Sequence, residues 1–317
     1  MQKRKGFGRI IGRSMSNLSI FRIQNNKLKE IRTKTFSTEL ELQKLVDNNL
    51  EEIFGFEFVK REFGGQGLSI DTIAYDPETK SPVLIEYKKD SYQSVVDQGM
   101  AYLHWLLTHK GDYQVALNEK LGVREIDWSQ PKVIFIAKNF NPHQIWASGF
   151  KNAPFELYRY ELCGDIFILE KVETPKSDVS ITSVLKTKET KKIIQQVKTF
   201  TLDDHLKKAN DKTKQLFETL RKMIFSMDER INEVPVSWYV GYKIRYFNFC
   251  AVIFKKEKLT VHVRKEKIDD PKNVFSRIPK EWAWGKTTIW RADIKNEDDI
   301  NYVFQIIKQG YQSAPDL

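Results

Sequence analysis

The sequence predicts an α/β protein of two domains, in which a mixed sheet flanked by helices is followed by a smaller α+β domain. Three observations predict this class. The chain has 317 residues, of which 41% are hydrophobic, and this is enough apolar material for two cores. Between residues 35 and 172, apolar side chains recur alternately at helical and at strand spacing. Residues 173–199 are rich in Ser, Thr and Lys, as expected of a linker, and regular patterns return at residues 200–317. Residues 1–34 form a basic arm that ends in the first strand.

The first domain is predicted to alternate helices with strands. Its first helix begins at Ser37–Glu41 with N-capping chemistry, buries Leu42 and Val46, and ends at Gly55. Two further helices are expected, at residues 92–109 and 141–149. Six strands complete the domain: residues 57–63, 68–75, 83–88, 133–136, 156–160 and 165–170.

The second domain begins with a strongly amphipathic helix over residues 202–223 and closes with another over residues 298–309. Four strands are expected between them: residues 238–246, 249–254, 259–264 and 287–294. A short helix is also expected within the linker, at residues 186–198.

Positive charge is concentrated at the N-terminus. The net charge is +10, and residues 1–34 alone hold ten basic side chains against one acid, Glu30. Residues 35–199 hold 20 basic and 24 acidic side chains, and residues 200–317 hold 22 and 17. A localised basic arm suggests a polyanionic partner, of which nucleic acid is the commonest. Two alternatives stay open, a solvated tail and a mitochondrial presequence, and the chain could also start naturally at Met15.

Two acidic residues and a lysine are predicted to share one face of a strand hairpin. Asp71 lies in the strand 68–75, and Glu86 and Lys88 lie in the strand 83–88. Strand side chains alternate, so Glu86 and Lys88 point the same way and Asp71 can meet Glu86 across the ladder. Close carboxylates repel, and Mg²⁺ or Mn²⁺ relieves the repulsion while activating water for attack on phosphate. Lys88 can position that water or offset developing charge. The alternative is an ordinary surface salt bridge.

Three more side chains are candidates for the same site. Glu39 lies on the inward face of the first helix with Leu42 and Val46, and it can reach a metal or its water. The alternative is that Glu39 only favours the helix N-terminus electrostatically. Gln98 and Tyr102 are four residues apart on the helix that follows the hairpin, so they project side by side. The alternative is a core tyrosine beside a solvated glutamine.

These motifs resemble those of the PD-(D/E)XK nuclease superfamily, and the Gln98-x-x-x-Tyr102 element resembles its RecB-like branch. Residues 36–43 and 49–55 resemble the C-terminal nuclease domain of NucS-type endonucleases. The resemblance covers roughly residues 18–172. Nothing before the first helix resembles the separate DNA-binding domain of NucS proteins, so their substrate preferences are not transferred.

The resemblance implies a restriction-endonuclease-like sheet and Mg²⁺-dependent hydrolysis of phosphodiester bonds. It implies that Asp71, Glu86 and the carbonyl of Tyr87 are metal ligands and that Lys88 is the catalytic lysine. One departure is that Ser69-Ile70 stands where the motif has its proline.

The C-terminal part, from about residue 200 to 315, resembles a domain of unknown function that recurs beside such nuclease domains and is sometimes labelled a predicted transport protein. Trp282, Trp284 and Lys286 could stack bases and hold phosphates. Core aromatics beside a glycine turn are the favoured alternative. No stretch approaches the roughly 18 apolar residues of a membrane span, so an integral membrane protein is excluded and no residue supports the transport label.

Other chemistries find little support. The two cysteines, Cys163 and Cys250, exclude a disulfide scaffold and a thiolate zinc cage and suit a reducing cytoplasm. The histidines lack metal-ligand spacing, and there is no P-loop and no Gly-x-Ser-x-Gly motif.

We therefore expect a cytoplasmic, Mg²⁺- or Mn²⁺-dependent endonuclease acting on DNA in defence, restriction or repair, with a homodimer among the expected assemblies. One alternative is a catalytically idle module that binds nucleic acid or assists assembly, and another is a transport-associated soluble protein. The intact set of Asp71, Glu86 and Lys88 argues against the idle module.

Overall fold

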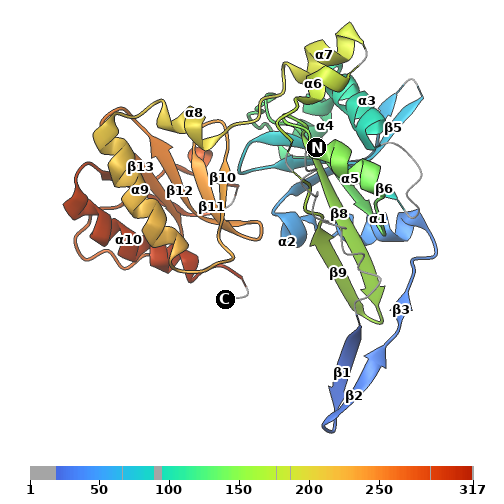
Figure 1. Ribbon diagram of the computed structural model, residues 1–317, viewed down its shortest axis with the longest axis horizontal. Helices are drawn as coiled ribbons and strands as arrows, with labels where there is room; N and C mark the ends of the chain where they lie inside the picture. Colours follow the sequence, from blue (N-terminus) through green and yellow to red (C-terminus); the bar gives the residue numbers. More distant parts are fainter. Residues whose placement is uncertain are drawn as a thin grey trace, which may run out of the picture.

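The first domain is built around a seven-stranded mixed sheet, as the computed structural model shows (Figure 1). The structure describes residues 19–65, 67–88, 95–175, 177–185, 187–285 and 287–315. The strands run in the order β3–β8–β7–β6–β5–β4, and β9 pairs with β8. The β6–β7 and β7–β8 pairs are parallel and the others are antiparallel. The strands are β3 (Thr33–Lys34), β4 (Glu57–Gly65), β5 (Leu68–Asp76), β6 (Ser81–Lys88), β7 (Lys132–Ala137), β8 (Phe155–Cys163) and β9 (Ile166–Lys171).

Helices cover both faces of this sheet. The helices are α1 (Glu39–Asp47), α2 (Leu50–Phe54), α3 (Val95–Thr108), α4 (Lys110–Leu121) and α5 (Pro142–Ser148). On one face, Leu42 and Val46 of α1 share a core with Ile85 and Tyr87 of β6. On the other face, α3 and α4 form a core with alternate residues of β5, β6 and β7, which include Leu84. The alternation along β6 therefore places Glu86 and Lys88 on the α3 side, and the predicted mixed sheet flanked by helices is confirmed.

The second domain is a six-stranded antiparallel sheet with two long helices packed on one face. Its strands run in the order β10–β11–β12–β13–β15–β14, and every pair is antiparallel. The strands are β10 (Asn232–Pro235), β11 (Val240–Ile244), β12 (Phe247–Phe254), β13 (Leu259–Arg264), β14 (Ser276–Arg277) and β15 (Ile289–Ile294). The helices are α8 (Leu202–Leu206), α9 (Asp211–Phe225), α10 (Glu297–Tyr311) and a 3₁₀ turn at Lys280–Trp282. This is the smaller α+β domain that the sequence predicts.

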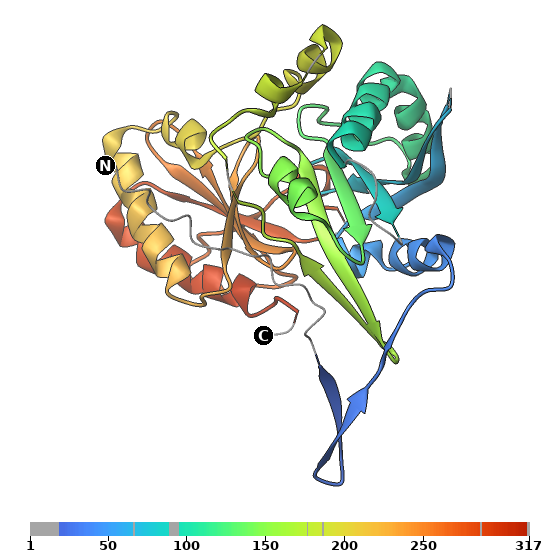
Figure 2. The same cartoon turned by 45° about the vertical axis from the view of Figure 1, so that its right-hand side comes forward.

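A two-stranded hairpin precedes the first domain and forms a sheet of its own. It consists of β1 (Ile20–Gln24) and β2 (Lys27–Ile31), and it projects away from the two domains (Figures 1 and 2). Residues 1–18 lie outside the described residues. Most of the predicted basic arm, and the presequence interpretation, therefore lie outside them as well.

Two predicted helices are each divided in two. The first is interrupted after α1, where the side-chain amide of Asn49 donates to the carbonyl of Leu45 at 2.7 Å and α2 starts afresh. The helix predicted over residues 202–223 is interrupted between α8 and α9, where the Asn210 side chain caps α9 by accepting from Thr213 N at 2.9 Å. Both single-helix predictions are wrong for one reason: asparagine side chains bond nearby backbone groups and so favour helix ends.

Two further segments differ from the predictions. Helix α4 follows α3 directly and was not predicted, because few of its residues, among them Tyr113 and Leu117, are buried. The segment 173–199 was predicted as a linker with one short helix at residues 186–198. That helix is confirmed as α7 (Lys188–Ile194), whereas α6 (Ile181–Val184) was not predicted. These helices contribute three buried isoleucines to the core of the first domain, Ile181, Ile193 and Ile194. Although segment 173–199 is polar in composition, its few apolar residues pack on the first domain and attach the segment to it.

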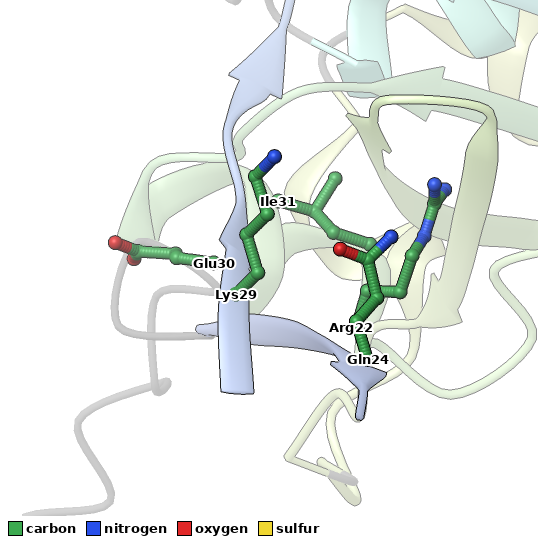
Figure 3. Close-up of a pocket in the computed structure, with 5 residues that line it drawn as sticks. All are labelled: Arg22, Gln24, Lys29, Glu30 and Ile31. Atoms are coloured by element: carbon green, nitrogen blue, oxygen red, sulfur yellow. The ribbon is translucent and has the colours of Figure 1, made fainter. Parts of the chain in front are cut away.

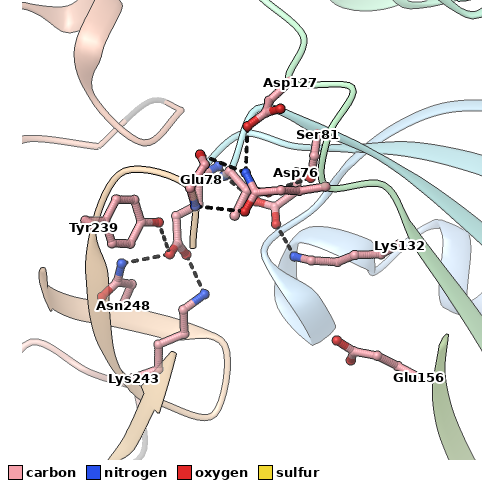
Figure 4. Close-up of polar contacts among 12 residues, drawn as sticks. Asp76, Glu78, Ser81, Asp127, Lys132, Glu156, Tyr239, Lys243 and Asn248 are labelled. Carbon is pink, nitrogen blue, oxygen red and sulfur yellow. Dashed lines mark hydrogen bonds and ion pairs between the residues drawn. The ribbon is translucent and has the colours of Figure 1, made fainter. Parts of the chain in front are cut away.

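A polar junction joins the two domains at the β5–β6 turn (Figure 4). The carboxylate of Glu78 in this turn accepts hydrogen bonds from Tyr239 Oη at 2.5 Å, Asn248 Nδ2 at 2.7 Å and Lys243 Nζ at 2.9 Å. Gln130 and Ser237 exchange two further bonds across the junction, each 2.9 Å long. The turn lies at the opposite end of β5 and β6 from Asp71 and Glu86. The second domain therefore contacts the β5–β6 hairpin at the end that is far from these two carboxylates.

Candidate active site

Asp71 and Glu86 face each other where the pairing of β5 and β6 ends. The regular register stops at Thr72↔Ile85, one pair before Asp71 and Glu86 would meet. The next backbone donor, Tyr87 N–H, bonds to the Asp71 carboxylate at 2.8 Å instead of to the β5 backbone. The N–H and C=O of one strand residue point to the same side, so the Tyr87 carbonyl also faces the Asp71 side. Two carboxylates and a carbonyl therefore converge at the open end of this hairpin.

The carboxylate of Glu86 is enclosed, with 2% of the residue exposed. One of its oxygens accepts from Gln98 Nε2 at 2.5 Å and forms an ion pair with the Lys88 ammonium. The other accepts from Tyr102 Oη, and Gln98 also donates to Tyr102 Oη at 2.8 Å. Helix α3 thus supplies two side chains, four residues apart, that fix the orientation of the Glu86 carboxylate.

The electrostatics of the site are unusual for surface carboxyl groups. Burial and the neighbouring charge of Glu86 raise the pKa of Asp71 to about 7. Glu39 raises this pKa further, whereas the Tyr87 amide and Lys88 lower it. For Lys88, burial lowers the pKa, but the hydrogen bond and charge of Glu86 and the charge of Asp71 outweigh burial, and the pKa is raised. Lys88 is therefore fully protonated at neutral pH, beside a carboxyl group that is not fully ionised.

Helix α1 contributes one predicted and one unpredicted residue. Glu39 stands in its first turn, and its charge acts on both Asp71 and Lys88. Gln43, one turn further along the same face, is buried and donates through Nε2 to the Asp71 carbonyl at 2.6 Å and to Thr72 Oγ1 at 3.2 Å. Sequence reasoning did not assign Gln43 to the site. Its position four residues after Glu39 was the available signal.

A buried polar network supports the site from the α1 face of the sheet. Asp47 accepts from Thr72 Oγ1 at 2.9 Å, from Tyr87 Oη at 2.8 Å and from Arg61 Nε at 2.5 Å. Thr72 and Tyr87 are the neighbours of Asp71 and Glu86 along their strands. The network therefore holds both strands in place just where their backbone pairing ends.

The donor set determines which ion the site could hold. Within the described ranges, no three side chains of His, Cys, Asp or Glu gather as a metal cage. Asp71, Glu86 and the Tyr87 carbonyl offer oxygen donors only, and the charges of Glu39 and Lys88 both act on Asp71. Hard oxygen donors suit Mg²⁺ or Mn²⁺ and do not suit a thiophilic metal.

The aromatic residues predicted for base stacking are divided between surface and core. Trp284 is 3% exposed, its ring centre lies 5.6 Å from that of Tyr239, and it belongs to a buried cluster of the second domain. Trp282 is 60% exposed. Lys286 lies outside the described residues. The core interpretation therefore holds for Trp284, and this tryptophan is not available to stack on a base.

Comparisons with known proteins place the chain in a family. Residues 202–314 match the model of DUF5655, a domain of unknown function. An uncharacterized protein of Haemophilus influenzae is 32% identical over 299 residues, which cover 92% of this chain and 99% of that protein. The chain belongs to the same family as this Haemophilus influenzae protein.

A solved structure of an EndoMS–dsDNA2 complex is also similar, at 18% identity and a TM-score of 0.21. That match covers 36% of this chain and 44% of the EndoMS chain, so less than half of EndoMS is spanned. Among the described residues, no helix is both long and apolar enough to cross a membrane.

Proposed function

We propose that the protein is a Mg²⁺-dependent endonuclease that hydrolyses phosphodiester bonds in DNA. The observation that carries the proposal is the convergence of Asp71, Glu86 and Lys88 at the unpaired end of the β5–β6 hairpin. The motif resemblance to PD-(D/E)XK nucleases names the same residues, and the fold supplies the mixed sheet on which such a site would stand.

In this proposal Mg²⁺, or Mn²⁺ in its place, is held by the carboxylates of Asp71 and Glu86 and by the carbonyl of Tyr87. When bound, such an ion lowers the pKa of water and offsets negative charge on phosphate. The Tyr87 amide keeps Asp71 turned toward Glu86. Gln98 and Tyr102 keep Glu86 in one orientation, and burial with the Glu86 bond raises the pKa of Tyr102, so its hydroxyl remains a donor.

Lys88 has two roles in this proposal. In the structure its ammonium neutralises Glu86. With a substrate phosphate at the site, the same ammonium, kept charged by its raised pKa, orients the attacking water and offsets the charge that develops on the phosphate oxygens. Glu39, at the start of α1, adds negative charge on the side of Asp71 and Lys88.

One observation favours the rival function, an idle nucleic-acid-binding module. Glu86 is already satisfied by Lys88, Gln98 and Tyr102, which is also what a structural salt bridge requires. The rival has no use, however, for a second, half-buried carboxyl group beside Glu86, that of Asp71, whose pKa is raised to about 7. Carboxyl groups with raised pKa values cluster at functional sites.

The test is incubation of the full chain with supercoiled plasmid and with branched DNA, in Mg²⁺, in Mn²⁺ and in EDTA. We expect cleavage with either ion and none in EDTA. Asp71→Asn and Glu86→Gln should abolish it, while Asp165→Asn, at an exposed carboxylate in the β8–β9 turn, should leave it unchanged. If both Asp71→Asn and Glu86→Gln still cleave DNA at the wild-type rate, the proposal is refuted.

A further inference from the structure

The projecting β1–β2 hairpin has two chemically different faces. Residues that pair directly across the strands share a face, and the register is Arg22↔Lys29, Gln24↔Lys27, Ile23↔Leu28 and Phe21↔Glu30. One face thus carries all three basic side chains of the hairpin, and the other carries Phe21, Ile23 and Leu28 with Glu30. Figure 3 shows Glu30 directed away from Arg22 and Gln24. The hairpin tip is formed by Asn25 and Asn26, both with positive φ.

The basic face is not explained by folding. Arg22 and Lys29 stand directly opposite each other, and like charges in this position destabilise a strand pair. The ion pair of Arg22 with Asp165 is 3.2 Å long, but its side chains are 52% and 80% exposed, and such surface pairs contribute little. Lys27 and Lys29 are also exposed. An isolated two-stranded hairpin is marginal in water. A polyanion beside this face would relieve the repulsion.

The hairpin lies at the same end of the sheet as the candidate site. Lys88 is level with Ala137, and Ala137 is level with Arg159 in the parallel strands β6, β7 and β8. Strand β8 continues four residues further, to Cys163, where it pairs with Thr33 at the base of the hairpin. At about 3.3 Å per residue and about 4.8 Å between strands, four residues along β8 and the three strand spacings from β6 to β3 place Thr33 roughly 20 Å from Lys88. One turn of duplex DNA, about 34 Å, would reach from the site to the hairpin.

We infer that the β1–β2 hairpin is a duplex-binding ribbon, which rests on the proposed nuclease function and names its substrate as double-stranded DNA. A two-stranded β-ribbon fits the major groove. Arg22, Lys27 and Lys29 would contact phosphates of both groove walls. Gln24, Asn25 and Asn26 at the tip carry the amide groups that pair with adenine edges.

The test measures binding without cleavage, so it is independent of the nuclease assay. A fluorescent 25-base-pair duplex is titrated in EDTA, by anisotropy, at several KCl concentrations. Lys27→Ala combined with Lys29→Ala should reduce the slope of log affinity against log salt by about 1.8, because each lost phosphate contact removes about 0.9. The matched control is Lys255→Ala with Lys256→Ala, at an exposed turn of the second domain, and its slope should equal that of the wild type.

Three outcomes would overturn the inference. The first is that the double lysine variant has the same slope of log affinity against log salt as the wild type. The second is that this variant loses as much affinity for single-stranded DNA, which has no groove, as for the duplex. The third concerns the apolar face: if Ile23→Ser with Leu28→Ser turns a dimer into a monomer while the lysine variant binds duplex normally, the ribbon serves a second copy of the chain. If the slope is reduced but the wild-type protein cleaves no DNA, the duplex-binding ribbon is supported and the nuclease function is refuted. If the wild-type protein cleaves DNA but the slope is unchanged, the nuclease function is supported and the ribbon is refuted.

Discussion

Asp71 is the residue whose state depends most on its surroundings. Burial and the charge of Glu86 raise its pKa from 3.8 to about 7, so the folded protein holds a proton that the unfolded chain releases. Such a group stabilises the fold fully below pH 3.8, and this contribution is lost as the pH rises through about 7. In EDTA we therefore predict that Asp71→Asn melts at a higher temperature than the wild type at pH 8 and at nearly the same temperature at pH 4.

The size of this effect can be bounded. Two unit charges 4 Å apart repel by roughly 4 kcal/mol at an effective dielectric of 20, and a quarter of this would shift Tm by about 2–4 °C. Thermal melts at pH 4, 6 and 8 measure it, with Asp165→Asn as the exposed control. Mg²⁺ should raise the Tm of the wild type at pH 8 and that of Asp71→Asn much less. A destabilised, metal-indifferent Asp71→Asn would instead identify a salt bridge.

Helix α3 is the element that sets the position of Gln98 and Tyr102, and its closeness to the sheet depends on Gly99. A Cβ added at Gly99 would lie 2.5 Å from Cε1 of the buried Phe155 ring. Overpacking of this kind costs about 1–3 kcal/mol. We predict that Gly99→Ala lowers the Tm and also slows cleavage, because α3 must move away from Glu86.

Gly111, in α4, provides the matched control for Gly99. Among the described residues, and apart from its own turn of α4, no atom lies within 4 Å of a Cβ built there. Gly111→Ala should stabilise the protein by about 0.4–1 kcal/mol, since alanine restricts the unfolded chain and suits a helix. Thermal melts and cleavage rates of both variants are compared with the wild type. Equal Tm values for the two variants would show that α3 is not closely packed on β8.

The same elements show how far the sequence could predict the site. Apolar periodicity placed Leu42 and Val46 inward, and Glu39 with them, so the helix face that meets the hairpin was predictable. Gln43 and Asp47 lie on that face but escaped prediction. Their burial is possible only because Thr72 and Tyr87 supply partners, and periodicity does not reveal which strand residues a helix will meet.

The breaks after α1 and before α9 were missed for a related reason. Helical spacing continues across Asn49 and Asn210, and only the hydrogen bonds of these side chains show that the backbone turns there. The alternation that brings Asp71, Glu86 and Lys88 together is a local property of two strands joined by a short turn. Sequence spacing was sufficient to predict it.

At the scale of the whole molecule, the second domain holds the β5–β6 turn through Glu78. The side chains of Glu78 and Lys243 are only 12% and 14% exposed, and Asn248 is fully buried. Removing one partner of a buried ion pair costs about 3–5 kcal/mol, because the other charge stays buried. We predict that Glu78→Ala weakens the junction, so that the two domains unfold in separate calorimetric transitions.

A companion variant makes this prediction specific. Glu78→Ala with Lys243→Met removes both charges and should recover much of the lost stability. Limited proteolysis between the domains should follow the same order, fastest for Glu78→Ala. If Glu78→Ala unfolds in a single transition at the wild-type temperature, the junction contributes nothing to holding the domains together.

The most direct measurement of the central claim is the rate at which Lys88→Ala cleaves plasmid DNA in Mg²⁺. Lys88 touches Glu86 and, in the proposed reaction, the phosphate or its water, and removing one such charge-stabilising donor typically slows an enzyme by 10²–10³-fold. We predict a loss of at least about 100-fold for Lys88→Ala and none for Lys255→Ala, an exposed lysine of the second domain. Cleavage by Lys88→Ala at the wild-type rate would contradict the assignment of this site.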